Sequence, residues 1–301
     1  MQTMLSVLKF MLWFILAIQV GCQSLRPKGD SMATKRPLIH GHRGSRGTHP
    51  ENTLPAFNEA VNAGANVLEM DLQLTSDDVL VLSHDPELTS EHCLDSKGKA
   101  LKKPVVIRKI KAAEFLTYDC GSLGNSHFLE QAKIPKTHPM TLEALLIWAE
   151  KAAPNLLLNI EIKRVPPPSA PQVMPPMELF VDKFIEAIHK HKRTESTILQ
   201  SFDMDVIRYA KTKSTLKLSC LFEQGNNFCD VTRSLGATIA SPLNTLLNDK
   251  VVAHCRKYGI ALHPWTANTE AEWAELTRLG VDGIITDYPR KLNQYLNHTM
   301  K

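Results

Sequence analysis

Residues 67–84 read VLEMDLQLTSDDVLVLSH and contain two runs that are typical of β-strands. In the first run, 67–74, large apolar residues alternate with polar or acidic ones, and the second run, 79–84, is rich in valine and leucine. Only the turn-like Ser76-Asp77-Asp78 separates them. Parallel neighbours in a sheet need a crossover of about a dozen residues or more. We therefore expect the second run to return antiparallel to the first, as a hairpin.

The rest of the chain alternates strand-like and helix-like runs. With the hairpin run set aside, eight β-rich runs are expected to be strands: 38–43, 67–74, 156–163, 197–202, 216–222, 237–241, 260–266 and 282–286. Amphipathic runs predict helices at 52–63, 141–152, 177–191, 204–212, 230–235, 247–258, 270–279 and, more weakly, 289–297. This alternation favours an α/β fold of the (β/α)8 TIM-barrel type. A doubly wound open sheet is the alternative, and it is disfavoured because no G-x-G-x-x-G follows the first strand.

Two segments interrupt the alternation. Residues 86–140 form an insertion after the hairpin, and residues 166–176 hold six of the chain's 18 prolines, which excludes a helix or a central strand there. Both segments follow strand ends, so we expect both on the catalytic face of the barrel.

The composition is that of a globular protein, with 43% hydrophobic and 22% charged residues. The formal net charge is only +4, and no basic stripe is interleaved with aromatic residues. We therefore expect no nucleic-acid partner.

Residues 1–21 have the pattern of an export signal. The apolar run 10–20 follows Lys9 and is too short to cross about 30 Å of hydrocarbon as a helix. Gly21-Cys22 resembles a bacterial lipoprotein cleavage box, which would make Cys22 a lipidated membrane tether. An uncleaved anchor is the alternative. The expected organisation is a signal peptide at 1–21, a tether at 22–36 and a barrel at 37–297, in an exported protein that is periplasmic or anchored to a membrane.

Five further cysteines remain, and export permits disulfides. Cys93 and Cys120 share one irregular segment and are the best candidate bridge, although both could be free. Cys255 lies in an expected helix and is expected to be a buried thiol.

Ionisable residues gather at the ends of the expected strands. Catalytic groups of a barrel lie at the carboxyl ends of its strands, and the polar residues found there are His42, Arg43, Glu69, Asp71, His84, Glu161, Lys163, Trp265 and Asp287. Three carboxylates on strands suit a hard cation such as Ca²⁺ or Mg²⁺. Adjacent cationic side chains suit a phosphoryl group, whose charge spreads over its oxygens. Two histidines can exchange protons near neutral pH.

These residues, in this order, resemble one known family. The motifs His42-Arg43-Gly44, Pro50-Glu51-Asn52-Thr53, Glu69-x-Asp71, His84-Asp85, Glu161-x-Lys163 and Trp265 are similar to those of the glycerophosphodiester phosphodiesterase family, from about residue 38 to residue 287. The resemblance implies a barrel in which Glu69, Asp71 and Glu161 hold the metal, His42 and His84 form the acid–base pair, and Arg43 and Lys163 bind the phosphate. It also implies Glu51 as a metal ligand or as the partner of Arg43, and Trp265 as a candidate substrate platform.

The implied activity is metal-dependent hydrolysis of a glycerophosphodiester to glycerol 3-phosphate and an alcohol. Whether water attacks directly or a substrate hydroxyl first forms a cyclic phosphate stays open. The alternatives are a phospholipase D-type or lysophospholipid phosphodiesterase, a phosphodiester-binding lipoprotein without catalysis, and an amidohydrolase-like zinc barrel. The last is suggested by the His40-x-His42 pair together with His263, although His40 is expected to be structural.

Overall fold

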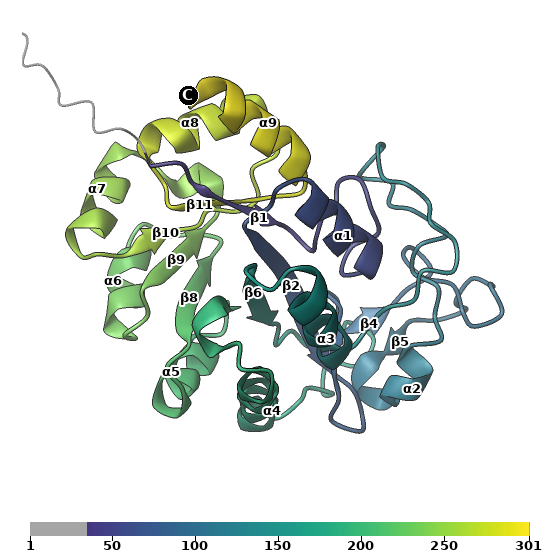
Figure 1. The fold of residues 1–301 in the computed structure, drawn as a ribbon. Coiled ribbons are helices and arrows are strands. Elements are labelled where there is room, and N and C mark those ends of the chain that lie inside the picture. Colours follow the sequence, from purple (N-terminus) through teal and green to yellow (C-terminus); the bar gives the residue numbers. More distant parts are fainter. Residues whose placement is uncertain (1–34, 301) are drawn as a thin grey trace, which may run out of the picture. The chain divides into compact units, whose positions relative to one another are not determined.

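The computed structural model describes residues 35–300 and contains a barrel of parallel strands surrounded by helices (Figure 1). The strands lie in the order β10-β9-β8-β7-β6-β2-β1-β11. Their bounds are β1 Leu38–Gly41, β2 Val67–Leu74, β6 Leu157–Ile162, β7 Thr197–Ser201, β8 Lys217–Phe222, β9 Ile239–Pro242, β10 Ala261–Leu262 and β11 Gly283–Thr286. The two ends of this order meet through backbone bonds: the amide of Asp282 donates to the carbonyl of Leu262 (3.0 Å), and that of Ile285 donates to the carbonyl of Pro264 (3.0 Å). The predicted (β/α)8 barrel is therefore confirmed.

The hairpin that decided the prediction is present. Strand β3, Leu80–Leu82, pairs antiparallel with β2, and Leu72 lies opposite Leu82. Strand β10 is shorter than the expected run 260–266, because Pro264 has no amide hydrogen to donate to a ladder. The segment still follows β9, since the amide of Trp265 donates to the carbonyl of Pro242 (3.1 Å).

Helices follow the strands in the expected places. They are α1 Leu54–Asn62, α3 Leu142–Ala152, α4 Met177–Lys190, α5 Met204–Lys213, α6 Phe228–Ser234, α7 Asp249–Lys257, α8 Glu270–Leu279 and α9 Pro289–Thr299, with the short 3-10 turns η2 Thr194–Ser196 and η3 Asn244–Leu246. Helix α1 begins two residues later than predicted, because Asn52 has a positive φ of 55° and Thr53 is the extended N-cap. Among the residues described, no helix is long and apolar enough to cross a membrane.

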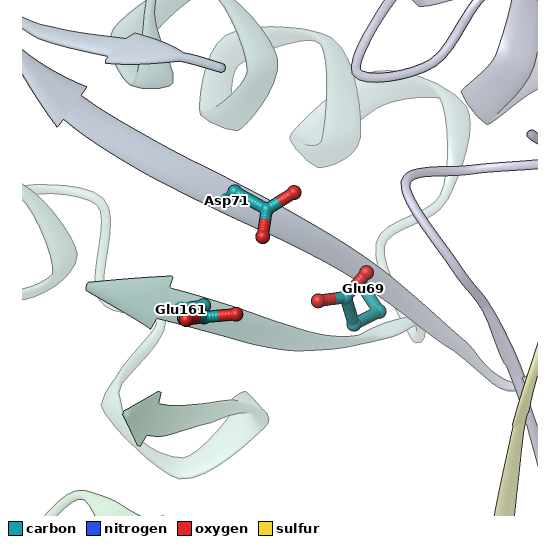
Figure 2. Close-up of side chains that lie close together, drawn as sticks. All are labelled: Glu69, Asp71 and Glu161. Carbon is teal, nitrogen blue, oxygen red and sulfur yellow. The ribbon is translucent and has the colours of Figure 1, made fainter. Parts of the chain in front are cut away.

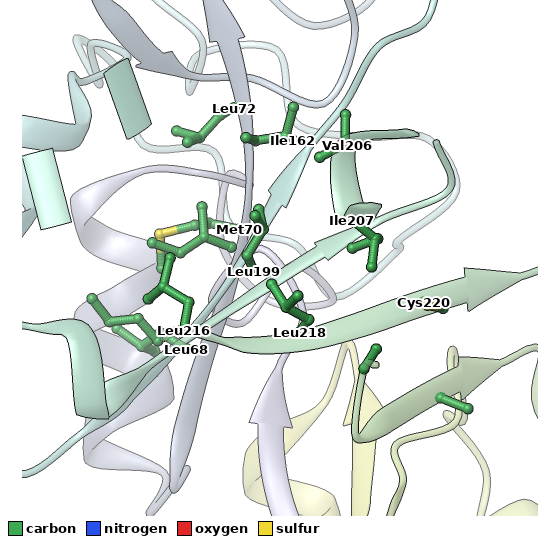
Figure 3. Packing of buried hydrophobic residues seen from close by; sticks show 14 of the residues in the cluster. Leu68, Met70, Leu72, Ile162, Leu199, Val206, Ile207, Leu216, Leu218 and Cys220 are labelled. Carbon is green, nitrogen blue, oxygen red and sulfur yellow. The ribbon is translucent and has the colours of Figure 1, made fainter. Parts of the chain in front are cut away.

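The hydrophobic core lies between the strands and the helices. Leu68, Met70 and Leu72 of β2 are fully buried there and pack beside residues of β7, β8 and α5 (Figure 3). Alternate residues of the same strand, Glu69 and Asp71, point to the other face. The period of two in this strand thus separates the apolar layer under the helices from a polar barrel interior.

Two histidines occupy that interior below the strand ends. The rings of His40 and His263 meet edge to face with centroids 4.7 Å apart, and both side chains are buried. A Cβ atom at Gly283 would lie 2.8 Å from His40 Nε2 and 3.0 Å from His263, so glycine is required to leave room for the pair. The structural role expected for His40 agrees with this packing.

The 86–140 insertion contains small elements of its own. They are β4 Glu87–Leu88, β5 Val105–Val106, the 3-10 turn η1 Ile107–Lys109 and helix α2 Ala112–Phe115. These pack around a separate apolar cluster that includes Phe115 and Tyr118. Cys93 and Cys120 form a disulfide within the insertion, which confirms the expected bridge. β4, β5 and α2 lie together at one side of the barrel (Figure 1).

The prediction for Cys255 was wrong. Cys255 of α7 forms a disulfide with Cys229 of α6, and Cys220 is the free cysteine of the described chain. The two cysteines are 26 residues apart in the sequence, and that separation does not indicate that they face each other from neighbouring helices. The expected signal peptide 1–21 and the tether at 22–36, apart from its last two residues, lie outside the described residues.

Candidate active site

Three buried carboxylates meet where the middle of β2 runs beside the carboxyl end of β6. Asp71 lies opposite Glu161 in the parallel register of the two strands, and Glu69 lies one inward position earlier. One oxygen from each of the three side chains lies within 4.8 Å of the other two. Figure 2 shows the three side chains reaching toward the space between the strands. Such a set of oxygen atoms could hold a hard divalent cation.

Burial and mutual repulsion disfavour the charged form of two of these carboxylates. Burial, followed by the charge of Asp71, raises the pKa of Glu69 well above its usual range and that of Glu161 to about 8. Burial also opposes ionisation of Asp71, but Arg43 and other nearby cations outweigh it and lower the pKa of Asp71. Glu161 Oε1 is buried without a hydrogen-bond partner, and the Nζ of Lys163 is 3.7 Å away. An unpartnered buried carboxylate oxygen fits a position next to a bound cation.

Arg43 connects the carboxylates to the loop that precedes α1. It has a positive φ of 49°, and this turn directs its backbone amide to Glu69 Oε2 (2.8 Å). Its Nη1 donates to Glu51 Oε1 (2.8 Å), and its Nε is 3.3 Å from Asp71 Oδ2. Burial opposes the charge on Arg43, but the carboxylates around it raise its pKa. Despite burial, the pKa of Glu51 is lowered to about 2, because Arg43 and Arg46 both lie against it. Of the two roles expected for Glu51, these contacts fit the partner of Arg43.

His42 is held by a residue from the last strand end. Its Nδ1–H donates to Asp287 Oδ1 (2.6 Å), and its Nε2 faces the carboxylates, 3.9 Å from Glu69 Oε2. The Nδ2 of Asn268 donates to the other oxygen of Asp287 (2.7 Å). Burial lowers the pKa of His42, and Asp287 partly offsets that effect. The Asp287 bond fixes which ring nitrogen carries the proton and leaves Nε2 free toward the cavity.

His84 lies on the more open side of the site. Its Nδ1 bonds to Asp85 Oδ1 (2.7 Å), and its side chain is 27% exposed. Across the site, Trp265 Nε1 donates to the carbonyl of Ser241 (2.8 Å), and its ring meets that of Phe202 edge to face at 5.5 Å. The Nζ of Lys163 lies 5.6 Å from the Phe202 ring.

One cavity of about 160 Å³ joins these side chains. Every expected site residue except Glu51 lines it, namely His42, Arg43, Glu69, Asp71, His84, Glu161, Lys163 and Trp265. The strand ends thus bring together the residues that the sequence placed far apart.

Comparison with known proteins agrees with this geometry. The profile of the glycerophosphoryl diester phosphodiesterase family matches residues 42–291. The chain belongs to this family. A glycerophosphodiester phosphodiesterase of Caldanaerobacter subterraneus subsp. tengcongensis is 30% identical over 259 residues, which are 85% of this chain and 96% of the relative. The family resemblance found in the sequence and the predicted enzyme class, a phosphoric diester hydrolase, are confirmed.

Solved structures share the barrel. A structure from Silicibacter pomeroyi DSS-3, assigned as a glycerophosphoryl diester phosphodiesterase, superposes with a TM-score of 0.81 at 25% identity and covers 88% of this chain and 94% of its own. An Oleispira antarctica phosphodiesterase in complex with the product sn-glycerol-3-phosphate has a TM-score of 0.70 at 21% identity, covering 87% of this chain and 97% of its own. At that identity, the second likeness shows the fold alone.

Sequence reasoning missed several residues of this family member's site. Asp287 was noted at a strand end, but its bond to His42 was not foreseen. Gln200 Nε2 donates to Glu69 Oε1 (2.8 Å), and Arg46 lies 2.7 Å from Glu51. The available signal was position: Gln200 lies near the end of β7, which pairs with β6, and Asp287 follows β11, which pairs with β1.

The zinc-barrel alternative finds no support at these positions. His40 contacts His263 within the barrel, one layer away from His42. Within residues 35–300, the group of side chains able to hold a metal consists of carboxylates alone. Zinc prefers histidine and cysteine ligands.

Proposed function

We propose that this enzyme hydrolyses glycerophosphodiesters to glycerol 3-phosphate and an alcohol with the help of a divalent cation, Ca²⁺ or Mg²⁺. The observation that carries the proposal is one cavity in which the carboxylate cluster meets Arg43, Lys163 and two imidazoles. The name of the Caldanaerobacter relative supports the same substrate class.

Glu69, Asp71 and Glu161 would hold the cation. Their oxygens suit Ca²⁺ or Mg²⁺, and the unpartnered Glu161 Oε1 supports the assignment. When bound, a divalent cation supplies Lewis-acid polarisation of a phosphoryl oxygen.

Arg43 and Lys163 would bind the phosphate oxygens beside the cation. Both line the cavity, and each already lies near one of the carboxylates, Asp71 and Glu161 respectively. Their charges would attract the anionic diester and stabilise the charge that develops on its oxygens. Trp265, held by Ser241, would offer an apolar face to the carbon skeleton of the substrate.

His42 would accept a proton and His84 would donate one. The bond to Asp287 keeps the proton of His42 on Nδ1, so Nε2 is an acceptor that faces the cavity. His84 is bonded to Asp85 through Nδ1 and has the more open side chain, which suits delivery of a proton to a departing alcohol.

Product analysis tests this proposal. Purified protein is incubated with glycerophosphocholine, glycerophosphoethanolamine, glycerophosphoinositol or a lysophospholipid, under Ca²⁺, Mg²⁺ or a chelator. We expect glycerol 3-phosphate from the glycerophosphodiesters, and loss of turnover in the chelator that either cation restores. Turnover confined to the lysophospholipid would favour the phospholipase D-type alternative. Full activity in the chelator would refute the metal role.

We further propose that the protein is exported and tethered through Cys22. The leader pattern at 1–21 is one support. The other is the pair of disulfides, Cys93–Cys120 and Cys229–Cys255, because such bonds persist mainly in oxidising compartments.

A further inference from the structure

A second cavity lies on the far side of His84, between the barrel and the insertion. It has a volume of about 70 Å³, and its walls include Glu51 and His84 from the barrel side and Leu88, Cys93 and Cys120 from the insertion. His84 also lines the cavity that contains the carboxylate cluster. The two spaces are therefore neighbours that share one imidazole.

The charge of this second cavity is negative. Three carboxylates line it, those of Glu51, Asp85 and Glu87, whereas within residues 35–300 no lysine or arginine does. Arg43 and Arg46 both form ion pairs with Glu51, and Asp85 is bonded to His84. Glu87 is the carboxylate that no cation of the described chain balances.

Glu87 is held in place by neutral groups. It lies on β4 and is only 7% exposed. Its Oε2 accepts bonds from the hydroxyl and the backbone amide of Ser169, in the proline-rich loop. In the described structure Oε1 accepts no hydrogen bond and is not among the fully buried unpartnered atoms. The residue itself is one of those that line the cavity. A largely buried carboxylate with a free oxygen suits a cationic ligand.

We propose that Glu87 is a specificity-determining residue that binds the positive charge of the leaving alcohol, so that the enzyme prefers glycerophosphodiesters of amino alcohols. This inference rests on the proposed function. With the phosphate beside Arg43 and Lys163 and the departing oxygen at His84, the alcohol extends past His84 into the second cavity. An ammonium or trimethylammonium group would there meet the free oxygen of Glu87.

Competing substrates measure the preference. We compare kcat/KM for glycerophosphocholine and glycerophosphoethanolamine, which carry cations, with kcat/KM for glycerophosphoglycerol and glycerophosphoinositol, which do not. The wild type should favour the cationic pair. In Glu87→Gln, which keeps the size of the side chain, the ratio of cationic to neutral kcat/KM should fall on the order of tenfold, as expected for loss of a charge-assisted contact. A wild type without preference, or an unchanged ratio in the variant, overturns the inference.

Two further variants distinguish the effect of the Glu87 charge from the effect of the Ser169 hydrogen bond that holds it in place. Glu91→Gln removes an exposed carboxylate of the same insertion and should leave the ratio within twofold of wild type. Ser169→Ala removes the hydroxyl bond and keeps the carboxylate, so the ratio should persist. If Ser169→Ala lowers the ratio as much as Glu87→Gln does, then the proline-rich loop sets the preference and the inference is wrong.

Binding without turnover distinguishes this inference from the proposed function. Calorimetric titration with choline, and with glycerol as the neutral control, should show Glu87-dependent binding of choline alone. If no glycerophosphodiester is hydrolysed but choline still binds in this way, the proposed function fails and the cation site stands. If choline does not bind the wild type, the cation site fails whatever the activity.

Discussion

Replacing His263 with asparagine should make the protein less sensitive to acid. His263 and His40 are buried together in the barrel interior, and burial is the main reason that the pKa of His263 falls from 6.5 to about 4 and that of His40 falls well below its usual value. Asp282 and Lys35 act on His263 in opposite directions. Both imidazoles are therefore neutral in the folded protein at pH values where they would be charged in the unfolded chain.

The sign and the size follow from these values. Because the folded pKa lies below the unfolded one, the unfolded state binds more protons between about pH 6.5 and pH 4, and acid favours unfolding. For His263 alone, linkage with a pKa of about 4 against 6.5 lowers the free energy of unfolding by about 2 kcal/mol between pH 8 and pH 5. The limiting loss below pH 4 is about 3 kcal/mol. His40 adds to the effect in the same direction.

Urea unfolding at a series of pH values, with the disulfides intact, measures this directly. The comparison is the pH slope of the free energy of unfolding, so a constant loss from repacking in His263→Asn does not obscure it. As a control, His191→Asn should act in a different window: burial opposes the charge on His191, but Glu150 and Glu143 outweigh it and raise its pKa, so the variant should lose the stability that the wild type gains as the pH falls toward about 6.5. An acid slope in His263→Asn equal to that of the wild type would refute the reasoning.

The other predictions concern the active site and export. Asp71→Asn and Glu161→Gln should each weaken Ca²⁺ or Mg²⁺ binding on the order of 100-fold in calorimetry; unchanged affinity would remove that residue from the ligand set. His84→Ala should lower kcat about 100-fold or more with glycerophosphocholine and recover with a nitrophenyl phosphodiester, which needs no proton on departure, whereas His42→Ala should not recover; equal behaviour of the two would contradict the assigned roles. Mass spectrometry of the native protein should find a lipidated Cys22 at the N-terminus, and an intact Met1 would exclude cleavage.

The order of strands and helices was predictable because it depends on local patterns. Alternation within 67–74 and the short turn before Val79 fixed one hairpin, and the remaining runs then matched the barrel. The carboxylates Glu69, Asp71 and Glu161 were predictable for the same reason, since a period of two places Glu69 and Asp71 on one face and parallel pairing brings Glu161 beside them.

The contacts that orient the site were not predictable in this way. The bond between His42 and Asp287 spans 245 residues, and the Cys229–Cys255 bridge depends on how two helices rotate against each other. The hydrogen bond from Ser169 to Glu87 joins two irregular segments, and neither segment has a sequence periodicity that could predict the contact. Such contacts follow from the closed shape of the barrel, and no local pattern records them.

The pairing of β1 with β11 also has a consequence for the synthesis and the proteolysis of the chain. The two strands come from opposite ends of the barrel sequence, and the residues that follow them, His42 and Asp287, are bonded to each other. This strand pairing and the bond between His42 and Asp287 can therefore form only after residue 287 has been synthesised. On the role proposed for His42, we expect that a protease that removes the chain beyond β10 abolishes activity and leaves the three clustered carboxylates in place, because it removes Asp287.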